Sequence, residues 1–228
     1  MRIAMFTNTY LPHVGGVAQS VDRFTRGYRQ RGHRVLVVAP RFEGQPEAEE
    51  DVVRLPAIQN FNGSDFSVVL PASDELRRAI EAFEPEIIHS HHPFLIGNTA
   101  LRQAARYGVP LVYTLHTMYE HYTHYVPLGR DAMKRYVVEL VTGYANLCDG
   151  VIAPSESVEA ILHDRGVTTP IAVVPTGVDT ETFGSGDGRA ARQRLDMPSG
   201  AFLIGHVGRL APEKNLVFLA QALAHTLE

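Results

Sequence analysis

Cysteine and tryptophan are almost missing from this 228-residue chain, which has one Cys and no Trp. Because Cys148 stands alone, an intrachain disulfide and a zinc centre built on cysteines are both excluded. The lack of Trp weakens any interpretation in which indole rings form a stacking platform for a sugar or a base. No apolar run approaches the ~18 residues that a membrane-spanning helix needs, so the sequence predicts no transmembrane segment.

An excess of basic residues is also missing, since 21 Lys and Arg stand against 25 Asp and Glu for a net charge of −4. This balance argues against a nucleic-acid binder. The chain enters an apolar segment directly after Met1, without the layout of a signal peptide, and we therefore expect a cytoplasmic protein. With 45% hydrophobic and 20% charged residues, the composition is that of an ordinary globular domain.

A pair of glycines follows the first apolar segment. Residues 3–7 form a nearly continuous apolar run, typical of a strand buried on both faces of a parallel sheet. Gly15 and Gly16 come next, and the spacing of four apolar residues after them predicts a helix: Val17, Val21, Phe24 and Tyr28. Such a junction turns backbone N–H groups toward a bound anion, and glycine permits a close approach. The alternative is a sharp turn that needs glycine at positive φ.

Apolar runs and amphipathic segments alternate over residues 1–176. About seven strand candidates, with helices between most of them, predict an α/β fold with a Rossmann-like, doubly wound, mainly parallel sheet. An irregular linker is expected at 177–200, with one short helix at 189–195. A strand at 202–207 followed by a helix predicts that 201–228 is the truncated start of a second α/β domain.

Three arginines fall on the side of the first predicted helix that is opposite its apolar face: Arg23, Arg26 and Arg29. A solvated helix face is the favoured interpretation. A basic patch that contacts anionic lipid headgroups is the alternative.

Ligands of open parallel sheets collect at the carboxyl ends of the strands, and several polar features are expected there. They are the glycine pair, the histidines of residues 89–92, His116, and the later pair Arg209 and Lys214. A guanidinium and an ammonium beside a helix N-terminus suit a phosphate group. For Arg209 and Lys214 the alternative is a charged surface loop.

Six of the eleven histidines lie near predicted strand ends or in the loop after them: His89, His91, His92, His116, His121 and His124. A zinc site would need three or four of them to converge, and the sequence has no H-E-x-x-H signature. Hydrogen bonding to hydroxyl and phosphate oxygens is the favoured role, because imidazole can donate and accept near neutral pH. We therefore expect no metal and no cofactor.

Several motifs, taken in order, resemble the retaining family 4 glycosyltransferases of the GT-B fold. They are Gly15-Gly16, His89-Ser90-His91-His92-Pro93, Thr114-Leu115-His116-Thr117, Pro154-Ser155, Pro175-Thr176-Gly177-Val178-Asp179 and the run from Gly208 to Asn215. Together they span the whole chain. The chain is most similar in character to bacterial enzymes that glycosylate lipid acceptors such as diacylglycerol or phosphatidylinositol.

The resemblance implies a transferase with two Rossmann-like domains, of which the first receives the acceptor and the second binds a nucleotide-diphosphate sugar. It implies that His116 is the catalytic residue, in contact with the sugar near its reacting carbon. The donor phosphates would be bound by Gly15, Gly16, Arg209 and Lys214, and the acceptor or sugar by His13, His91, His92 and Tyr119. No metal is needed if Arg209 and Lys214 neutralise the leaving diphosphate.

Members of this family carry a pair of glutamates, eight positions apart, in a region that lies beyond residue 228. The 228 residues alone are therefore expected to be inactive. Residues 61–66 and 118–129 are expected to shape acceptor choice, and peripheral contact with the inner face of the membrane is a further expectation. Two other classes stay open: a non-enzymatic module that binds a sugar phosphate or an anionic membrane, and a metal hydrolase built on the histidines.

Overall fold

The computed structural model of the chain describes residues 1–47, 49–58, 68–69, 74–121, 130–208, 210 and 214–227. Residues 61–66, which were expected to shape acceptor choice, lie outside this part, as do 122–129. The chain divides into two compact units, Met1–Gly177 and Val178–Glu228.

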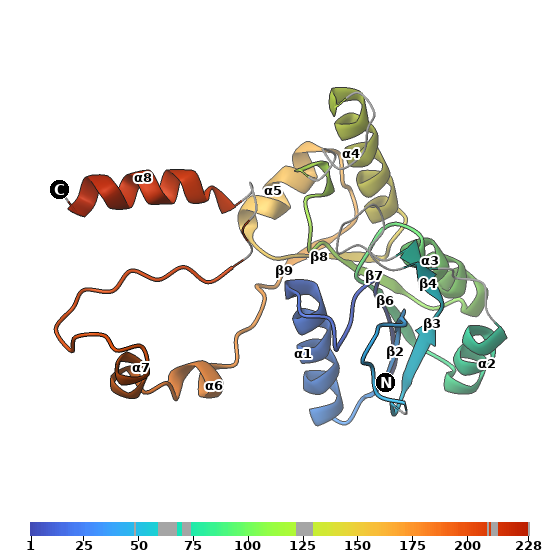
Figure 1. Ribbon diagram of the computed structural model, residues 1–228. Coiled ribbons are helices and arrows are strands. Elements are labelled where there is room, and N and C mark those ends of the chain that lie inside the picture. The colour runs from blue at the N-terminus through green and yellow to red at the C-terminus, as the bar shows by residue number, and fades with distance from the viewer. Residues whose placement is uncertain are drawn as a thin grey trace. The chain divides into compact units, whose positions relative to one another are not determined.

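A parallel sheet is the frame of the first unit, and Figure 1 shows it with helices on its flanks. The strands stand in the order β3-β2-β1-β6-β7-β8-β9 and every neighbouring pair is parallel. Their bounds are β1 Arg2–Phe6, β2 Arg34–Pro40, β3 Val52–Leu55, β6 Ile87–Ser90, β7 Leu111–Thr114, β8 Gly150–Ala153 and β9 Ile171–Val173. The predicted doubly wound, mainly parallel sheet is confirmed.

The direction of strand addition reverses at β1. The chain builds outward from β1 to β3 and then returns to place β6 on the other side of β1. A short antiparallel pair, β4 (Ala57–Ile58) with β5 (Val68–Val69), stands apart from the main sheet. In open α/β sheets, ligands bind outside the carboxyl ends of the strands at such a reversal. The residues after β1 and β6 therefore occupy the expected ligand position.

The central strands are buried on both faces, which explains their nearly continuous apolar sequence. In β1, Ala4 and Phe6 belong to a large cluster of buried residues, whereas Ile3 and Met5 belong to a smaller one. Alternate side chains of a strand point to opposite faces, so the two clusters are the two sides of the sheet.

The helices are divided unequally between these sides. Helix α1 (Gly16–Gln30) packs into the smaller cluster through Val21. The larger cluster receives side chains from four helices: α2 Asp74–Phe83, α3 Ile96–Tyr107, α4 Arg130–Asn146 and α5 Glu156–Asp164. Within the described residues, the α1 face is therefore less covered toward β8 and β9, where Ile152 is only half-buried and Ala172 is exposed.

The arginines of α1 are less uniformly solvated than predicted. The side chain of Arg26 is 69% exposed and pairs with Asp22 at 2.7 Å. Arg29 instead donates to the carbonyl oxygen of Val35 at 2.9 Å, and Arg23 to that of Gly177 at 2.5 Å. The interpretation as a solvated face is confirmed for Arg26, whereas Arg23 is half-buried.

The second unit contains three helices in its described residues: α6 Thr180–Gly184, α7 Gly188–Arg194 and α8 Leu216–Leu227. Helix α6 was not predicted; the Asp179 side chain caps it by accepting from the backbone N–H of Thr182. The strand predicted at 202–207 is wrong, because this segment is not paired with any described residues. A β-strand requires a neighbour for its backbone hydrogen bonds, and Phe202 and Val207 are fully exposed instead.

No helix in the described part of the chain is both long and apolar enough to cross a membrane.

Candidate functional site

The glycine pair lies where the loop after β1 meets α1. Gly15 is the N-cap at φ −165°, extended backbone that any residue adopts, and Gly16 does not have positive φ. The alternative of a turn that requires positive φ is therefore wrong. A Cβ on Gly15 would lie 3.0 Å from Nε2 of His13, but a Cβ on Gly16 would meet no described atom within 4 Å. Packing among the described residues thus explains a glycine at position 15 and leaves position 16 unexplained.

The N-terminus of α1 carries no compensating group of its own. Gly15 offers no side-chain cap, and the first turn of the helix has no acidic residue. The first N–H groups of a helix have no partner inside it, and the aligned peptide dipoles place a partial positive charge there. Because these N–H groups are uncapped and a side chain is absent at Gly16, this end of α1 can accept an anion.

Buried Arg54 holds the loop between β1 and α1 (residues 7–15, called the glycine loop) against the sheet. Its guanidinium donates to the carbonyl oxygens of Leu11 at 2.6 Å and Pro40 at 3.1 Å, and pairs in bidentate fashion with Glu49 at 2.6 and 2.7 Å. The same guanidinium lies 5.4 Å from the ring centroid of Tyr10. One side chain therefore joins the loop after β1 to the ends of β2 and β3, and fixes where α1 begins.

Histidines from β6 and β7 form a cluster at the carboxyl end of the sheet. Nδ1 of His91 lies 2.9 Å from Nε2 of His116, although the two residues are 25 positions apart. The ring centroids of His89 and His91 are 4.1 Å apart, and Nε2 of His89 lies 2.7 Å from the Thr114 hydroxyl. Among the described residues, no three His, Cys, Asp or Glu side chains are arranged to hold a metal ion. The cluster is a hydrogen-bonded stack of rings.

Burial keeps the histidine cluster uncharged. Burial, together with the nearby His116, lowers the pKa of His89 to about 3 and that of His92 to about 3. Burial also lowers the pKa of His116 to about 4, and burial and the neighbouring histidines hold the pKa of His91 well below its usual value. At neutral pH these rings are hydrogen-bonding groups and not cations. His116 can therefore orient a substrate oxygen but cannot supply a positive charge to it.

The backbone determines which nitrogen of His92 carries the proton. The backbone N–H of Asn8, just after β1, donates to Nδ1 of His92 at 3.1 Å. A neutral ring that accepts at Nδ1 has its proton on Nε2. His92 is therefore a hydrogen-bond donor at Nε2, and the contact joins the ends of β1 and β6 at the point of reversal.

Gly97 allows the start of α3 to lie against the backbone of His92. A Cβ on Gly97 would lie 2.1 Å from the carbonyl oxygen of His92, closer than any real contact. That same oxygen accepts from the Ser90 hydroxyl at 2.8 Å, and the Tyr144 hydroxyl donates to the carbonyl of Gly97 at 3.0 Å. The adjacent N-cap, Leu95, has φ +51°, an unfavourable conformation for a side chain of this size. The turn is thus held in a strained form by the packing around it.

We expect Gly97→Ala to destabilise the protein by about 1–3 kcal/mol, the usual range for added atoms in a packed region. The added methyl group must move the His92 carbonyl or the start of α3. Urea denaturation measures the loss. Gly143→Ala is the control, since Gly143 is an exposed helical position where a Cβ meets no described atom within 4 Å. Equal stability of the two variants would contradict the packing assigned to Gly97.

Other predicted site residues lie around this cluster rather than in it. The His13 ring stacks on Phe42, with ring centroids 5.6 Å apart. Tyr119 packs edge-to-face on Phe94, with centroids 5.0 Å apart, and burial raises the pKa of its hydroxyl. His121 is 69% exposed at its side chain. Among the described residues, neither His13 nor Tyr119 has a ring contact with the histidine cluster.

The structure describes only one of the two basic residues, Arg209 and Lys214, that were predicted to bind the donor phosphates. Arg209 lies outside the described residues, as does His124. Lys214 is exposed and belongs to the second unit, two residues before α8. The joint action of Arg209 and Lys214 on one phosphate stays a prediction.

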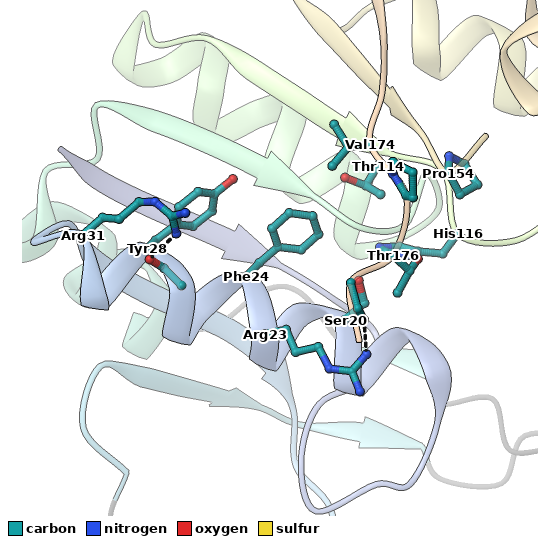
Figure 2. Close-up of a pocket in the computed structure, with 13 residues that line it drawn as sticks. Ser20, Arg23, Phe24, Tyr28, Arg31, Thr114, His116, Pro154, Val174 and Thr176 are labelled. Atoms are coloured by element: carbon teal, nitrogen blue, oxygen red, sulfur yellow. Dashed lines mark hydrogen bonds between the residues drawn. The ribbon is translucent and has the colours of Figure 1, made fainter. Parts of the chain in front are cut away.

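An open pocket of about 380 Å³ lies on the less covered face of the sheet, beside α1. Figure 2 shows Phe24 and Tyr28 of α1 on one side and His116, Pro154 and Val174 on the other. Of the predicted site residues, His116 alone lines this pocket within the described chain. The lining comes from α1 and from the segments that follow β7, β8 and β9, and it is mostly apolar.

Sequence reasoning missed several residues that build the site. Asn8 is a polar residue directly after a buried strand, the same signal that pointed to the histidines, but it was not predicted to be a site residue. Thr114 was read only as part of a strand and of a motif. Gly97 and Arg54 gave no local signal, because their roles depend on atoms that are distant in the sequence.

The chain is therefore an α/β protein with a polar, histidine-rich edge at the reversal point of a doubly wound sheet. Residues 14–182 match the family described as Glycosyltransferase Family 4, and the chain belongs to this family. It is 29% identical to the alpha-monoglucosyldiacylglycerol synthase of Streptococcus pneumoniae, over 100% of this chain and 53% of that protein. It is 30% identical to the GDP-mannose-dependent alpha-mannosyltransferase of Corynebacterium glutamicum, over 96% of this chain and 54% of that protein. The chain spans little more than half the length of these relatives.

Solved structures support the fold. The sucrose-phosphate synthase of Thermosynechococcus elongatus is similar with a TM-score of 0.74, 19% identity, and coverage of 98% of this chain and 59% of that one. Anabaena Alr3699/HepE in complex with UDP-glucose is similar with a TM-score of 0.68, 18% identity, and coverage of 99% and 57%. At these identities the likeness concerns the architecture only.

Proposed function

We propose that this chain is the acceptor-binding half of a retaining glycosyltransferase, which moves a sugar from a nucleotide-diphosphate sugar to an acceptor without a metal. The observation that carries the proposal is the neutral, hydrogen-bonded histidine cluster at the reversal point of a family 4 sheet. Neutral imidazoles beside an uncompensated helix N-terminus suit a ligand that combines hydroxyl groups with phosphate.

Each part of the site has a role in this proposal. The open end of α1 at Gly15 and Gly16 receives the donor diphosphate, and His116 meets the transferred sugar. His92, a fixed donor at Nε2, binds a hydroxyl of the sugar or of the acceptor, near His91, His13 and Tyr119. Arg209 and Lys214 neutralise the leaving diphosphate as charge develops on it.

A lipid is the acceptor class that we propose. The support is the relative whose name is alpha-monoglucosyldiacylglycerol synthase, which matches the whole of this chain. In this proposal, residues 1–176 form the acceptor domain, 177–200 a linker and 201–228 the start of the donor domain. The protein works in the cytoplasm as a peripheral protein at the inner face of the membrane.

The test is transfer from radiolabelled nucleotide sugars to lipid extracts by the full-length protein that contains this chain. Turnover by the full-length protein, and none by the 228 residues alone, is the expected result. Ligand binding without turnover by the full-length protein would favour the non-enzymatic module instead. Turnover that is lost on chelation and restored by zinc would contradict the metal-independent mechanism.

Gly16→Ala separates a ligand role from a folding role. Because Gly16 is the first residue of α1 and a Cβ there has open space, alanine should leave stability unchanged or raise it by up to about 1 kcal/mol. The methyl group should nevertheless obstruct the diphosphate and lower kcat/KM by about tenfold or more, a loss of about 1.4 kcal/mol. Melting and steady-state kinetics of the full-length protein measure both effects.

Gly143→Ala is the matched control for this variant. Gly143 is also a helical glycine with open space around its Cβ position, but it lies in α4, away from the glycine loop. It should show the same small gain in stability and unchanged kinetics. Full activity of the Gly16→Ala variant would contradict the proposal that the diphosphate binds at this end of α1.

A further inference from the structure

Two neutral imidazoles share a single hydrogen bond between Nδ1 of His91 and Nε2 of His116. A neutral ring has one N–H, and a hydrogen bond between two ring nitrogens needs one donor and one acceptor. Two arrangements are possible. Either His91 donates from Nδ1 and His116 accepts, or His116 donates from Nε2 and His91 accepts.

The other nitrogen of His91 decides between them. Nε2 of His91 is buried and has no partner among the described residues, and the His91 side chain is 0% exposed. If His91 accepted at Nδ1, its proton would stay on Nε2 as a buried N–H without an acceptor. Orphaned buried N–H groups are rare in proteins, whereas a buried acceptor without a donor is better tolerated. The arrangement with His91 as the donor leaves only a lone pair without a partner.

The surroundings hold His91 in place for this role. Its ring lies tilted against the ring of His89, whose Nε2 is bound to the Thr114 hydroxyl, and Phe24 of α1 lies 6.0 Å away by ring centroids. The backbone N–H of His91 donates to the carbonyl oxygen of Phe6 at 2.9 Å. The ring is therefore fixed from β1, β6, β7 and α1, and cannot turn away from His116 without disturbing the stack.

We propose that His91 is a positioning residue: its Nδ1–H donates to Nε2 of His116 and so makes Nδ1–H of His116 the group that faces the substrate. His116 lines the open pocket, and its Nδ1 has no partner among the described residues. His116 then binds a substrate oxygen as a donor and does not act as a base at that nitrogen. This inference rests on the proposed function for its chemistry, but the hydrogen bond is tested without activity.

The first experiment measures nitrogen-15 chemical shifts of the histidine rings in the 228-residue chain at pH 7.5, since these shifts separate a protonated from an unprotonated ring nitrogen. Spectra of His116→Gln and His91→Phe assign the signals. We expect a neutral His116 with its proton on Nδ1, and a neutral His91 with its proton on Nδ1. A proton on Nε2 of His116 in the unmodified chain overturns the proposal.

The second experiment compares two substitutions of His91. His91→Phe keeps a ring in the stack and removes the hydrogen bond, so His116 should lose its single tautomer. His91→Asn keeps a side-chain N–H close to the position of Nδ1 and should retain it. An unchanged His116 spectrum in a folded His91→Phe variant overturns the positioning role, because a residue that only fills space would give this result.

Kinetics of the full-length protein complete the test. His91→Phe should lower kcat about tenfold or more, with a smaller change in the KM for the donor, and His91→Asn should recover most of the loss. Equal losses in both variants would overturn the positioning role. If the spectra are as expected but His116→Ala keeps full turnover, the hydrogen bond stands and the catalytic role of His116 fails, so the two failures are distinguishable.

Discussion

His116→Ala in the full-length protein is expected to lower turnover by about 100-fold or more, the scale seen when one preorganised contact to a transition state is removed. His116 follows β7 by two residues, and its ring is held by His91, so its position is set by the sheet and not by a mobile loop. A rigidly held donor suits a hydrogen bond to an oxygen of the reacting sugar, because no reorganisation is needed during the reaction.

The fold should survive this substitution, since His116 is only half-buried at the rim of the pocket. His163→Ala is the control: it removes an exposed histidine from α5, outside the histidine cluster, and should leave turnover unchanged. Thermal melting accompanies the kinetics. A variant that melts far below the unmodified protein but keeps its turnover per folded molecule would make His116 a packing residue and remove it from the site.

Acidification from pH 7.5 to 5.5 is expected to lower the free energy of unfolding by about 5 kcal/mol. The folded state keeps His89, His91, His92 and His116 neutral, since burial lowers all four pKa values. Below about pH 6.5 the unfolded chain binds protons at these rings and the folded chain does not, so stability falls as pH falls. The full stability is present above about pH 6.5 and is lost progressively toward the folded-state pKa values near 3 to 4. Each ring contributes about 1.4 kcal/mol to this loss over the whole interval from pH 7.5 to 5.5.

Urea denaturation followed by circular dichroism measures this pH dependence. His91→Phe removes one of the four rings and should reduce the loss between pH 7.5 and 5.5 by about 1.4 kcal/mol, which makes the slope shallower. His225→Gln, which removes an exposed histidine from α8, should leave the slope unchanged. A protein equally stable at both pH values would show that the histidine cluster is not kept neutral by the fold.

The comparison of sequence and structure shows where local signals were sufficient. The continuous apolar runs and the helical spacing located the strands of the main sheet and helix α1, because buried parallel strands and amphipathic helices leave distinct apolar patterns. The strand predicted at 202–207 failed because an apolar run becomes a strand only when a neighbour pairs with it. Helix α6 was missed because five residues are too few to show a helical period.

The sequence by itself determined the fold class, the family and the positions at which polar residues leave the strands, since these follow from patterns within a few residues and from ordered motifs. Only the tertiary structure decided that β6 lies between β1 and β7, which brings His91 to His116 and the backbone of Asn8 to His92. It also decided that His89, His91 and His92 are buried and His116 half-buried, and hence that all four rings are neutral. Strand order and burial depend on contacts between distant residues, and no local pattern encodes the charge of a ring that such contacts enclose.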